Sequence, residues 1–381
     1  MNTVLICCDH YLPGYKAGGP ITTLSNLVTA IRDRCRVFVL TSDRDYLDSQ
    51  PYQGVDINGW TDFGDYMVRY LDRRSISIRG LVDIVSKVNP DSIYLNSLFS
   101  YDFSIRLLLA RRLGMIKVMR WVLCPRGELN AAALRKDALK KHLFLSAGKL
   151  IGLHEQLTWQ ATNEHEFSRI RKVIGSNSKV FEVTNLSRFV DEDKIPRLMV
   201  KQAGYLHMVY VGRINPHKNL SLLLDAMVNL LGNIELKIYG PVDDKVYWAK
   251  CCHKITSLPN NVRVVYAGVH GRDTVIEAMR WSHLLVLPSR GENYGQVIYE
   301  ALSVGTPVIV SDKTPWKGLA EKGVGWDCNI KSSEAIELAL SEVTLMDQTN
   351  WKALIPRSKA YARKTISHDK IIIDTMNLLF S

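Results

Sequence analysis

Short apolar runs rich in β-branched residues alternate along the chain with longer segments in which apolar residues recur every three or four positions. The first series of runs covers residues 4–7, 36–40, 92–95, 117–122 and 179–183. The second series covers residues 207–212, 235–240, 262–266, 284–287 and 307–310. The clearest helical stripe between runs consists of Leu220, Leu223, Leu224, Met227 and Leu231. This rhythm is typical of βαβ units and predicts an α/β protein with parallel sheets.

The two series are separated by residues 186–205, which lose the periodicity and carry charged residues and Pro196. Such a segment is typical of a linker. A chain of 381 residues is long for one core and suits two domains of roughly 150–200 residues each. We therefore predict similar α/β domains in tandem, an N-terminal one over residues 1–190 and a C-terminal one over residues 191–364.

The composition is that of an ordinary folded protein, with 46% apolar and 23% charged residues. The seven cysteines are an odd number, include the adjacent pair Cys7-Cys8 and form no Cys-x-x-Cys motif, so we expect reduced thiols and no structural zinc. The first residues lack the pattern of a secretory signal, and no apolar run approaches the length that spans a bilayer. We expect a cytoplasmic protein.

The net charge of +11 is concentrated in one segment. Residues 106–149 hold eleven Lys and Arg against Glu128 and Asp137, a local charge of +9. A basic patch of this kind suits nucleic acid, an anionic membrane or a phosphorylated substrate, so charge alone does not choose among them.

Two carboxylates follow the apolar run at residues 284–287. Glu292 lies at the entrance of a predicted helix, and Glu300 lies about two turns along nearly the same face. Ligands of open α/β sheets bind beyond the carboxyl ends of the strands, where this loop must lie. One carboxylate can meet a sugar and the other a ribose diol, while the amides around residues 294–296 are free to hold a diphosphate. The alternative is a helix-capping Glu and a solvated Glu.

A second loop, residues 211–219, also follows a strand and precedes a helix. Gly212 permits a tight turn, and Arg213 and Lys218 offer two cations to a diphosphate. The alternative is a basic surface loop. One cationic loop and one loop with paired carboxylates, both in the same domain, favour a nucleotide sugar as ligand.

These two loops read Gly-Arg-x4-Lys-Asn and Pro-Ser-x-x-Glu-x-Tyr-Gly-x4-Glu-Ala-x-x-x-Gly-x-Pro-Val-Ile. This pattern resembles the donor-domain signature of retaining family 4 glycosyltransferases. The resemblance implies the GT-B fold, in which two Rossmann-like domains face an interdomain cleft and a C-terminal helix, about residues 365–381, crosses back to the N-terminal domain. It implies that a donor nucleotide sugar contacts Gly18, Gly19, Gly212, Arg213, Lys218, Glu292, Asn293, Tyr294, Gly295, Gln296 and Glu300.

The resemblance also implies roles for these residues. Glu292 would contact the donor sugar, Glu300 the ribose, and Arg213 and Lys218 the diphosphate, with Gly18 and Gly19 approaching the phosphates from the N-terminal domain. Glu292, Arg213 and Lys218 would be the catalytic residues. No metal and no cofactor besides the nucleotide sugar are expected.

The Pro125-Arg126-Gly127 segment is similar to one in the O-antigen and capsule branch of that family. Arg126, His10 and His154 are the acceptor-side candidates, although a structural role for each histidine stays open. The family's Asn-Gly after the last N-terminal strand is Asn185-Leu186 here, so that turn is expected to differ.

The implied reaction moves a sugar from a UDP- or GDP-sugar to a saccharide acceptor with retention, and a polyprenyl-diphosphate-linked acceptor of bacterial surface polysaccharide synthesis is the branch's substrate class. Residues 129–150 predict a basic amphipathic helix in which Arg135, Lys136, Lys140 and Lys141 lie near Leu139, Leu143, Phe144 and Leu145. This segment is a candidate contact with the inner face of the plasma membrane, and a solvated helical face is the equal alternative.

Three other functional classes are alternatives for this sequence. A sugar-nucleotide epimerase on the same fold would need the same nucleotide loops and stays open. A nicotinamide dehydrogenase is disfavoured because no Gly-x-Gly-x-x-Gly follows either first strand. A nucleic-acid binder could use the basic segment, but no nucleic-acid-binding motif accompanies it, so no nucleic acid is expected as a partner.

Overall fold

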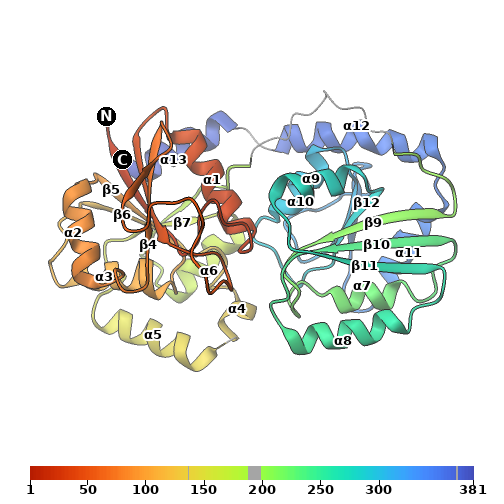
Figure 1. Cartoon of the computed structure of the whole chain (residues 1–381), viewed down its shortest axis with the longest axis horizontal. Helices are drawn as coiled ribbons and strands as arrows, with labels where there is room; N and C mark the ends of the chain where they lie inside the picture. The colour runs from red at the N-terminus through yellow and green to blue at the C-terminus, as the bar shows by residue number, and fades with distance from the viewer. Residues whose placement is uncertain (136, 188–198, 366–367) are drawn as a thin grey trace. The chain divides into compact units, whose positions relative to one another are not determined.

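A computed structural model describes residues 1–135, 137–187, 199–365 and 368–381. The chain divides into two compact units (Figure 1). The first unit comprises Met1–Leu186 with Ser367–Ser381, and the second comprises Ser187–Ile366. The predicted domains had boundaries at residues 190 and 364. Of the predicted linker, residues 188–198 lie outside the described residues, as does Lys136.

The first unit is built on one sheet, whose strands follow the order β3-β4-β2-β1-β5-β6-β7-β8 within the described residues. All neighbours are parallel except the β3–β4 pair. The strands are β1 (Thr3–Cys7), β2 (Arg36–Ser42), β3 (Trp60–Asp62), β4 (Tyr66–Leu71), β5 (Ser92–Asn96), β6 (Arg120–Cys124), β7 (Thr158–Ala161) and β8 (Lys179–Glu182). Chain order reverses between β1 and β5, so the switch point of this sheet lies there.

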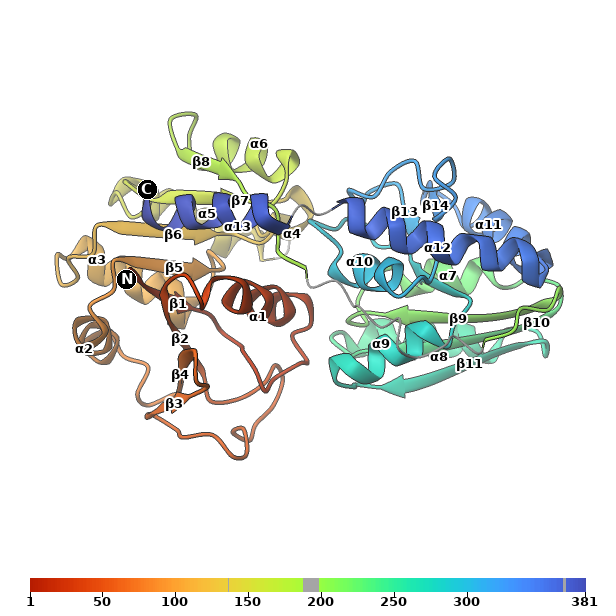
Figure 2. The ribbon, with the colours of Figure 1, turned by 90° about the horizontal axis from the view of Figure 1, so that it is seen from above.

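Helices cover both faces of this sheet. They are α1 (Gly19–Ile31), α2 (Ile78–Val88), α3 (Arg106–Arg112), which continues a π-helical turn at Tyr101–Ile105, α4 (Ala131–Arg135), α5 (Ala138–Leu150), α6 (Glu164–Val173) and α13 (His368–Phe380). Alternate residues of β1 enter different cores: Leu5 packs with α2 and α3, and Val4 and Ile6 pack with α1 and α13. Figure 2 shows α1 and α13 on the same face of the sheet.

The terminal helix α13 therefore completes the core of the first unit, as predicted. Leu378 and Leu379 are buried there, and the guanidinium of Arg120 on β6 donates to the carbonyl oxygen of Leu378 from Nε at 3.1 Å and Nη2 at 3.0 Å. None of the described helices combines the length and the apolar character needed to span a membrane.

The second unit has a parallel sheet in the order β11-β10-β9-β12-β13-β14 within the described residues. Its strands are β9 (Tyr205–Val211), β10 (Asn233–Tyr239), β11 (Val262–Gly268), β12 (Leu284–Leu287), β13 (Val308–Ser311) and β14 (Gly325–Cys328). Its helices are α7 (Leu220–Ala226), α8 (Lys245–Thr256), α9 (Arg272–Arg280), α10 (Gln296–Ser303), α11 (Glu334–Leu345) and α12 (Gln348–Thr365). Figure 1 shows α9, α10 and α12 on one face and α7 and α8 on the other.

This strand order determines where the loops after β9 and β12 leave the sheet. The chain runs from β9 outward to β10 and β11, and then returns to place β12 against the opposite edge of β9. The switch point of the second sheet therefore lies between β9 and β12. Both loops that sequence analysis singled out leave the sheet at this point.

Two expected elements differ from the structure. The run at residues 117–122 becomes a strand only from Arg120, because pairing with β5 begins at Ser92 opposite Arg120, and Met119 is 97% exposed. The helix expected over residues 129–150 is two helices, α4 and α5, and Asp137 between them has a left-handed φ of 57°. A continuous helix excludes that backbone conformation.

Two glycines allow the backbone at the carboxyl ends of β9 and β10 to pack closely. Gly240 has φ 136°, and a Cβ built there would lie 2.1 Å from the carbonyl oxygen of Gly212. The amide of Gly212 donates to Tyr239 at 2.9 Å. Only glycine fits at position 240, because any side chain would push away the turn that begins the Gly212 loop.

We predict that Gly240→Ala lowers the free energy of unfolding by roughly 3 kcal/mol, since the substitution combines backbone strain with a clash against backbone. Urea unfolding followed by circular dichroism measures this. Gly271→Ala is the matched control, because a Cβ at Gly271 meets no described atom within 4 Å and its φ is −64°; its effect should stay below about 1 kcal/mol. Equal effects of the two variants would contradict the steric argument.

Candidate active site

An ion pair joins the two loops at the switch point of the second unit. Lys218 lies in the loop after β9 and Glu292 in the loop after β12, and Nζ of Lys218 is 2.5 Å from Oε1 of Glu292. The side chains are 17% and 12% exposed. The stem of Lys218 runs over Gly212, where a Cβ would be 3.6 Å from Cδ of Lys218. That distance is an ordinary van der Waals contact, so the lysine stem packs directly over the backbone of the turn at position 212.

The electrostatics of this pair favour an ionised glutamate. Burial by itself raises the pKa of Glu292, but the charge and hydrogen bond of Lys218 outweigh it, and the pKa is lowered from 4.5. His217 lies alongside, with Nε2 2.8 Å from the carbonyl oxygen of Gly291. Burial lowers the pKa of His217, and the Glu292 carboxylate opposes that shift. The loop thus holds a buried carboxylate with a fixed cation.

Arg213 lies at the rim of this cluster. Its side chain is 44% exposed, and Nη1 is 3.8 Å from Oδ2 of Asp243, which also accepts a hydrogen bond from Nδ2 of Asn215 at 2.8 Å. The charge of Arg213 acts on the imidazole of His217 and lowers its pKa, as that of Lys218 does. Arg213 is therefore near the ion pair and keeps much of its guanidinium accessible.

The start of α10 adds backbone donors beside these side chains. Gly295 is the N-cap residue with φ 79°, and a Cβ there would be 2.7 Å from Cδ1 of Ile298. The carbonyl oxygen of Tyr294 accepts a hydrogen bond from Nε1 of Trp316 at 2.5 Å, which fixes the loop that holds Asn293 and Tyr294. The first amides of a helix have no intrahelical acceptor and favour an anion.

Glu300, on α10, is buried and has a partner that sequence analysis missed. Nε of Arg272, the first residue of α9, is 2.9 Å from Oε1 of Glu300. Burial raises the pKa of Glu300, and Arg272 counteracts part of that rise. Arg272 follows the end of β11, a strand whose carboxyl end faces the same side of the sheet. This position after a strand end is the sequence feature from which Arg272 could have been predicted as a site residue.

Gly18 and Gly19 lie at the start of α1 in the first unit. Gly18 is the N-cap residue with φ 70°, and a Cβ on either glycine would meet no described atom within 4 Å. Packing within the described residues therefore does not require glycine at position 19. The open backbone suits close approach of a ligand.

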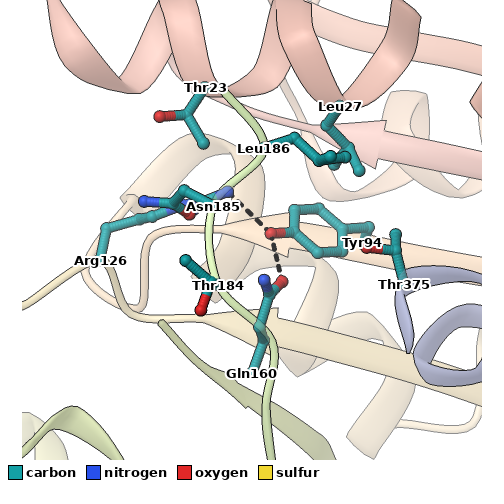
Figure 3. Close-up of a pocket in the computed structure, with 9 residues that line it drawn as sticks. All are labelled: Thr23, Leu27, Tyr94, Arg126, Gln160, Thr184, Asn185, Leu186 and Thr375. Carbon is teal, nitrogen blue, oxygen red and sulfur yellow. Dashed lines mark hydrogen bonds between the residues drawn. The ribbon is translucent and has the colours of Figure 1, made fainter. Parts of the chain in front are cut away.

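Arg126, just after β6, lines a small pocket of the first unit together with residues of α1, β5, β7 and α13 (Figure 3). Its Nε donates to Oδ1 of Asn96 at 2.7 Å, and its Nη2 donates to the hydroxyl of Tyr94 at 2.8 Å. Its Nη1 donates to Oδ1 of Asn185. The hydroxyl of Tyr94 donates onward to Gln160 at 2.8 Å. Arg126 thus holds Asn185, the residue at which the sequence departs from the family pattern.

The two histidine candidates have different surroundings. Burial lowers the pKa of His154 to about 4, its ring packs beside Phe144 and Trp159, and its Nε2 has no hydrogen-bond partner among the described residues. These contacts favour a structural role. His10 follows β1 at the switch point of the first sheet, half-buried, with Nδ1 3.2 Å from the carbonyl oxygen of Arg44.

Two carboxylates that sequence analysis did not select lie near that switch point. Oδ1 of Asp9 accepts a hydrogen bond from Ser100 at 2.6 Å, and burial raises the pKa of Asp9. Glu128 accepts from Ser97 and from the amide of Leu98, both at 2.6 Å. The carboxyl ends of β1, β5 and β6 therefore place polar groups around His10.

Comparison with known proteins gives the second unit a family likeness. Residues 191–359 match the model of the family Glycosyl transferases group 1. An uncharacterized glycosyltransferase of Methanocaldococcus jannaschii is 33% identical over 106 residues, which are 27% of this chain and 26% of that protein. The matched part thus spans about a quarter of the relative's length. Both comparisons liken a part of this chain to glycosyltransferases, and the family model places its part within the second unit.

Solved structures extend the likeness in fold to the whole chain. A sucrose-phosphate synthase from Thermosynechococcus elongatus has a TM-score of 0.71 at 16% identity, with 99% of this chain and 98% of that chain covered. Anabaena HepE, solved with UDP and glucose, has a TM-score of 0.69 at 15% identity, with 99% of each chain covered. The predicted fold class, two Rossmann-like α/β domains of the GT-B type, is confirmed.

Removal of Lys218 tests the electrostatics of the pair without reference to function. We expect Lys218→Met to lower the free energy of unfolding at pH 7 by roughly 3 kcal/mol, because it leaves a buried carboxylate unpaired. Lys254→Met is the matched control: Lys254 is 2.6 Å from Asp225, but the two side chains are 36% and 44% exposed, so the loss should stay below about 1 kcal/mol.

The pH dependence of the same variants gives an independent check. The lowered pKa of Glu292 makes the pair's stabilisation complete above about pH 4.5 and lost as pH falls through the folded-state pKa. In Lys218→Met, burial would raise the pKa of Glu292 above its unfolded value, so the loss relative to wild type should grow as pH rises past 4.5. Denaturant titrations between pH 4 and pH 8 measure this, and a pH-independent loss would contradict it.

Proposed function

Because the second unit matches the group 1 glycosyltransferases, we propose that the protein is a retaining glycosyltransferase that uses a nucleoside diphosphate sugar. The observation that carries this proposal is the buried Lys218–Glu292 pair between two loops at the switch point of the sheet. In this proposal Glu292 binds the transferred sugar and Glu300 the ribose. Lys218, Arg213 and the first amides of α10 bind the diphosphate.

The proposed chemistry needs positive charge where negative charge develops. Breaking the bond between sugar and diphosphate leaves charge on the diphosphate oxygens, and removal of one such donor typically slows a reaction by roughly 100- to 1000-fold. Without donor, Lys218 is occupied by Glu292; an incoming diphosphate supplies a second anionic partner for the same ammonium. The acceptor hydroxyl gives its proton to the leaving phosphate, so no metal and no separate base are part of the proposal.

The donor and acceptor are proposed as classes. UDP- and GDP-sugars are the donors to test first, and HepE, which shares the fold, was solved with UDP and glucose. A saccharide acceptor, carried on a polyprenyl diphosphate in bacterial surface polysaccharide synthesis, would bind the first unit. Gly18 and Gly19 would approach the donor phosphates, and His10 and Arg126 lie on the acceptor's unit.

We predict that Glu292→Gln abolishes sugar transfer while the protein stays folded, because the amide replaces the anionic acceptor of sugar hydroxyl hydrogen bonds. Release of UDP or GDP from a panel of nucleotide sugars, with and without saccharide acceptors, measures transfer. Glu334→Gln, at an exposed position on α11, is the control and should retain activity. Full activity of Glu292→Gln would remove the central assignment, and sugar conversion without an acceptor would favour an epimerase.

We also propose that the first unit contacts an anionic membrane through α5. Its leucines Leu139, Leu143 and Leu150 are 76%, 61% and 88% exposed and share one side of the helix. Lys140 and Lys149 flank that stripe and are exposed. Phe144 and Leu145 instead pack against the core of the first unit, contrary to the expected amphipathic face. Exposed leucines between lysines suit insertion at a lipid interface.

For the membrane proposal, we predict that Lys140→Gln/Lys149→Gln lowers binding to vesicles containing phosphatidylglycerol by about tenfold or more, since each cation contributes on the order of 1 kcal/mol near an anionic surface. Vesicle sedimentation measures binding, with phosphatidylcholine vesicles as the uncharged reference. The charge-matched control is Lys245→Gln/Lys250→Gln on α8, where both lysines are exposed. Equal sedimentation of the two double variants would end this proposal.

A further inference from the structure

Arg272 is the third cation of the candidate active site, after Lys218 and Arg213, and has no role in the function proposed above. It opens α9 directly after the loop that follows β11, and its Nε donates to Oε1 of Glu300 at 2.9 Å. Glu300 comes from α10, so the contact joins two helices on the same face of the sheet. The Glu300 side chain is 8% exposed, whereas that of Arg272 is 33% exposed.

The guanidinium is incompletely used in this contact. Its Nη2 is buried and has no hydrogen-bond partner among the described residues. A buried N–H without an acceptor costs roughly 1–3 kcal/mol, so native structures rarely keep one unless another group completes the site. An ion pair that served only to fasten α9 to α10 would not need this second, unpaired nitrogen.

The buried carboxylate of Glu300 in turn depends on the charge of Arg272. Burial raises its pKa, while the charge and the hydrogen bond of Arg272 lower it. Among described residues, the phenol of Tyr294 also interacts electrostatically with Glu300. The arginine is therefore the charged group that favours the carboxylate form. An ionised carboxylate offers both of its oxygens as acceptors to the two hydroxyls of a diol, whereas protonation turns one of those oxygens into an O–H donor.

We propose that Arg272 is a ribose-specificity residue: its Nε holds Glu300 oriented for the 2′,3′-diol of the donor nucleotide, and its unpaired Nη2 donates to a ribose oxygen. This inference rests on the proposed function, because it requires a nucleotide donor. It restricts the donor to ribonucleoside diphosphates, since a 2′-deoxyribose would forfeit one charge-assisted hydrogen bond and leave a buried polar atom unpaired.

The test compares ribo- and deoxyribonucleotides on the full-length protein by isothermal titration calorimetry. The probes are UDP, 2′-deoxy-UDP, GDP and 2′-deoxy-GDP. For the base that binds, we expect wild type to prefer the ribonucleotide by about 10- to 100-fold, the range of one charge-assisted hydrogen bond. In Arg272→Gln this preference should fall below about threefold, and Arg272→Lys, which keeps the charge but loses Nη2, should lie between the two.

Two further variants separate specificity from folding. Arg263→Gln is the control, because Arg263 lies on β11 with a 74% exposed side chain and pairs only with Glu235 among the described residues; its preference should equal that of wild type. Glu300→Gln should lose the preference as Arg272→Gln does, and the double variant should lose no more. Thermal unfolding of each variant checks that it is folded.

The outcomes are distinct. Binding of the ribonucleotide with an unchanged preference in folded Arg272→Gln overturns the assignment of Arg272 and leaves the proposed function intact. Failure of wild type to bind any of the four nucleotides overturns the proposed function, and the inference about the ribose with it. A collapse of the preference in Arg272→Gln and Glu300→Gln, but not in Arg263→Gln, supports both.

Discussion

The ion pair between Lys218 and Glu292 is the contact on which the architecture of the candidate site depends. Either charge left alone at its degree of burial would be costly, so each loop stabilises the other. The residues are 74 positions apart and meet only because β12 returns to pair with β9. Gly240 and Gly212 then hold the ends of the strands close enough for the lysine stem to lie over the turn. The pair thus turns a switch point into a preformed, charged site.

The other buried charges follow the same physical requirement with different partners. Glu300 is balanced by a cation, Arg272, as Glu292 is by Lys218. Arg126 instead donates hydrogen bonds to the uncharged oxygens of Asn96, Asn185 and Tyr94, with the charge of Glu166 acting on it from nearby. Glu128 accepts hydrogen bonds from a hydroxyl and two backbone amides. The second unit therefore pairs its buried carboxylates with cations near the switch point of its sheet. In the first unit, Arg126 serves to hold Asn185 close to the end of that unit's main segment.

Much of the fold could be predicted from local pattern. The runs that became β1, β2, β5 and β9 through β13 were found because buried parallel strands are continuously apolar. Strands with polar residues among the apolar ones were harder to predict: β4, β7 and β14 contain Arg69, Gln160 and Asp327 and were missed. The strand at residues 117–122 was placed early because Met119 is apolar yet 97% exposed. On α5 the pattern named the right segment, but of the apolar residues that it named only Leu139 and Leu143 are exposed, whereas Phe144 and Leu145 pack against the core. Hydrophobicity does not reveal which apolar residues meet a core.

The sequence by itself determined the α/β class, the two series of βα units and the two strand-to-helix loops, because each depends on residues within a few positions of one another. The tertiary structure decided which charges become partners. Arg272 reaches Glu300 across 28 positions, and Arg126 reaches Asn185 across 59. Such pairs are set by strand order and helix packing, which bring distant segments together and exclude water between them. The periodicity of apolar residues along the sequence does not predict that arrangement.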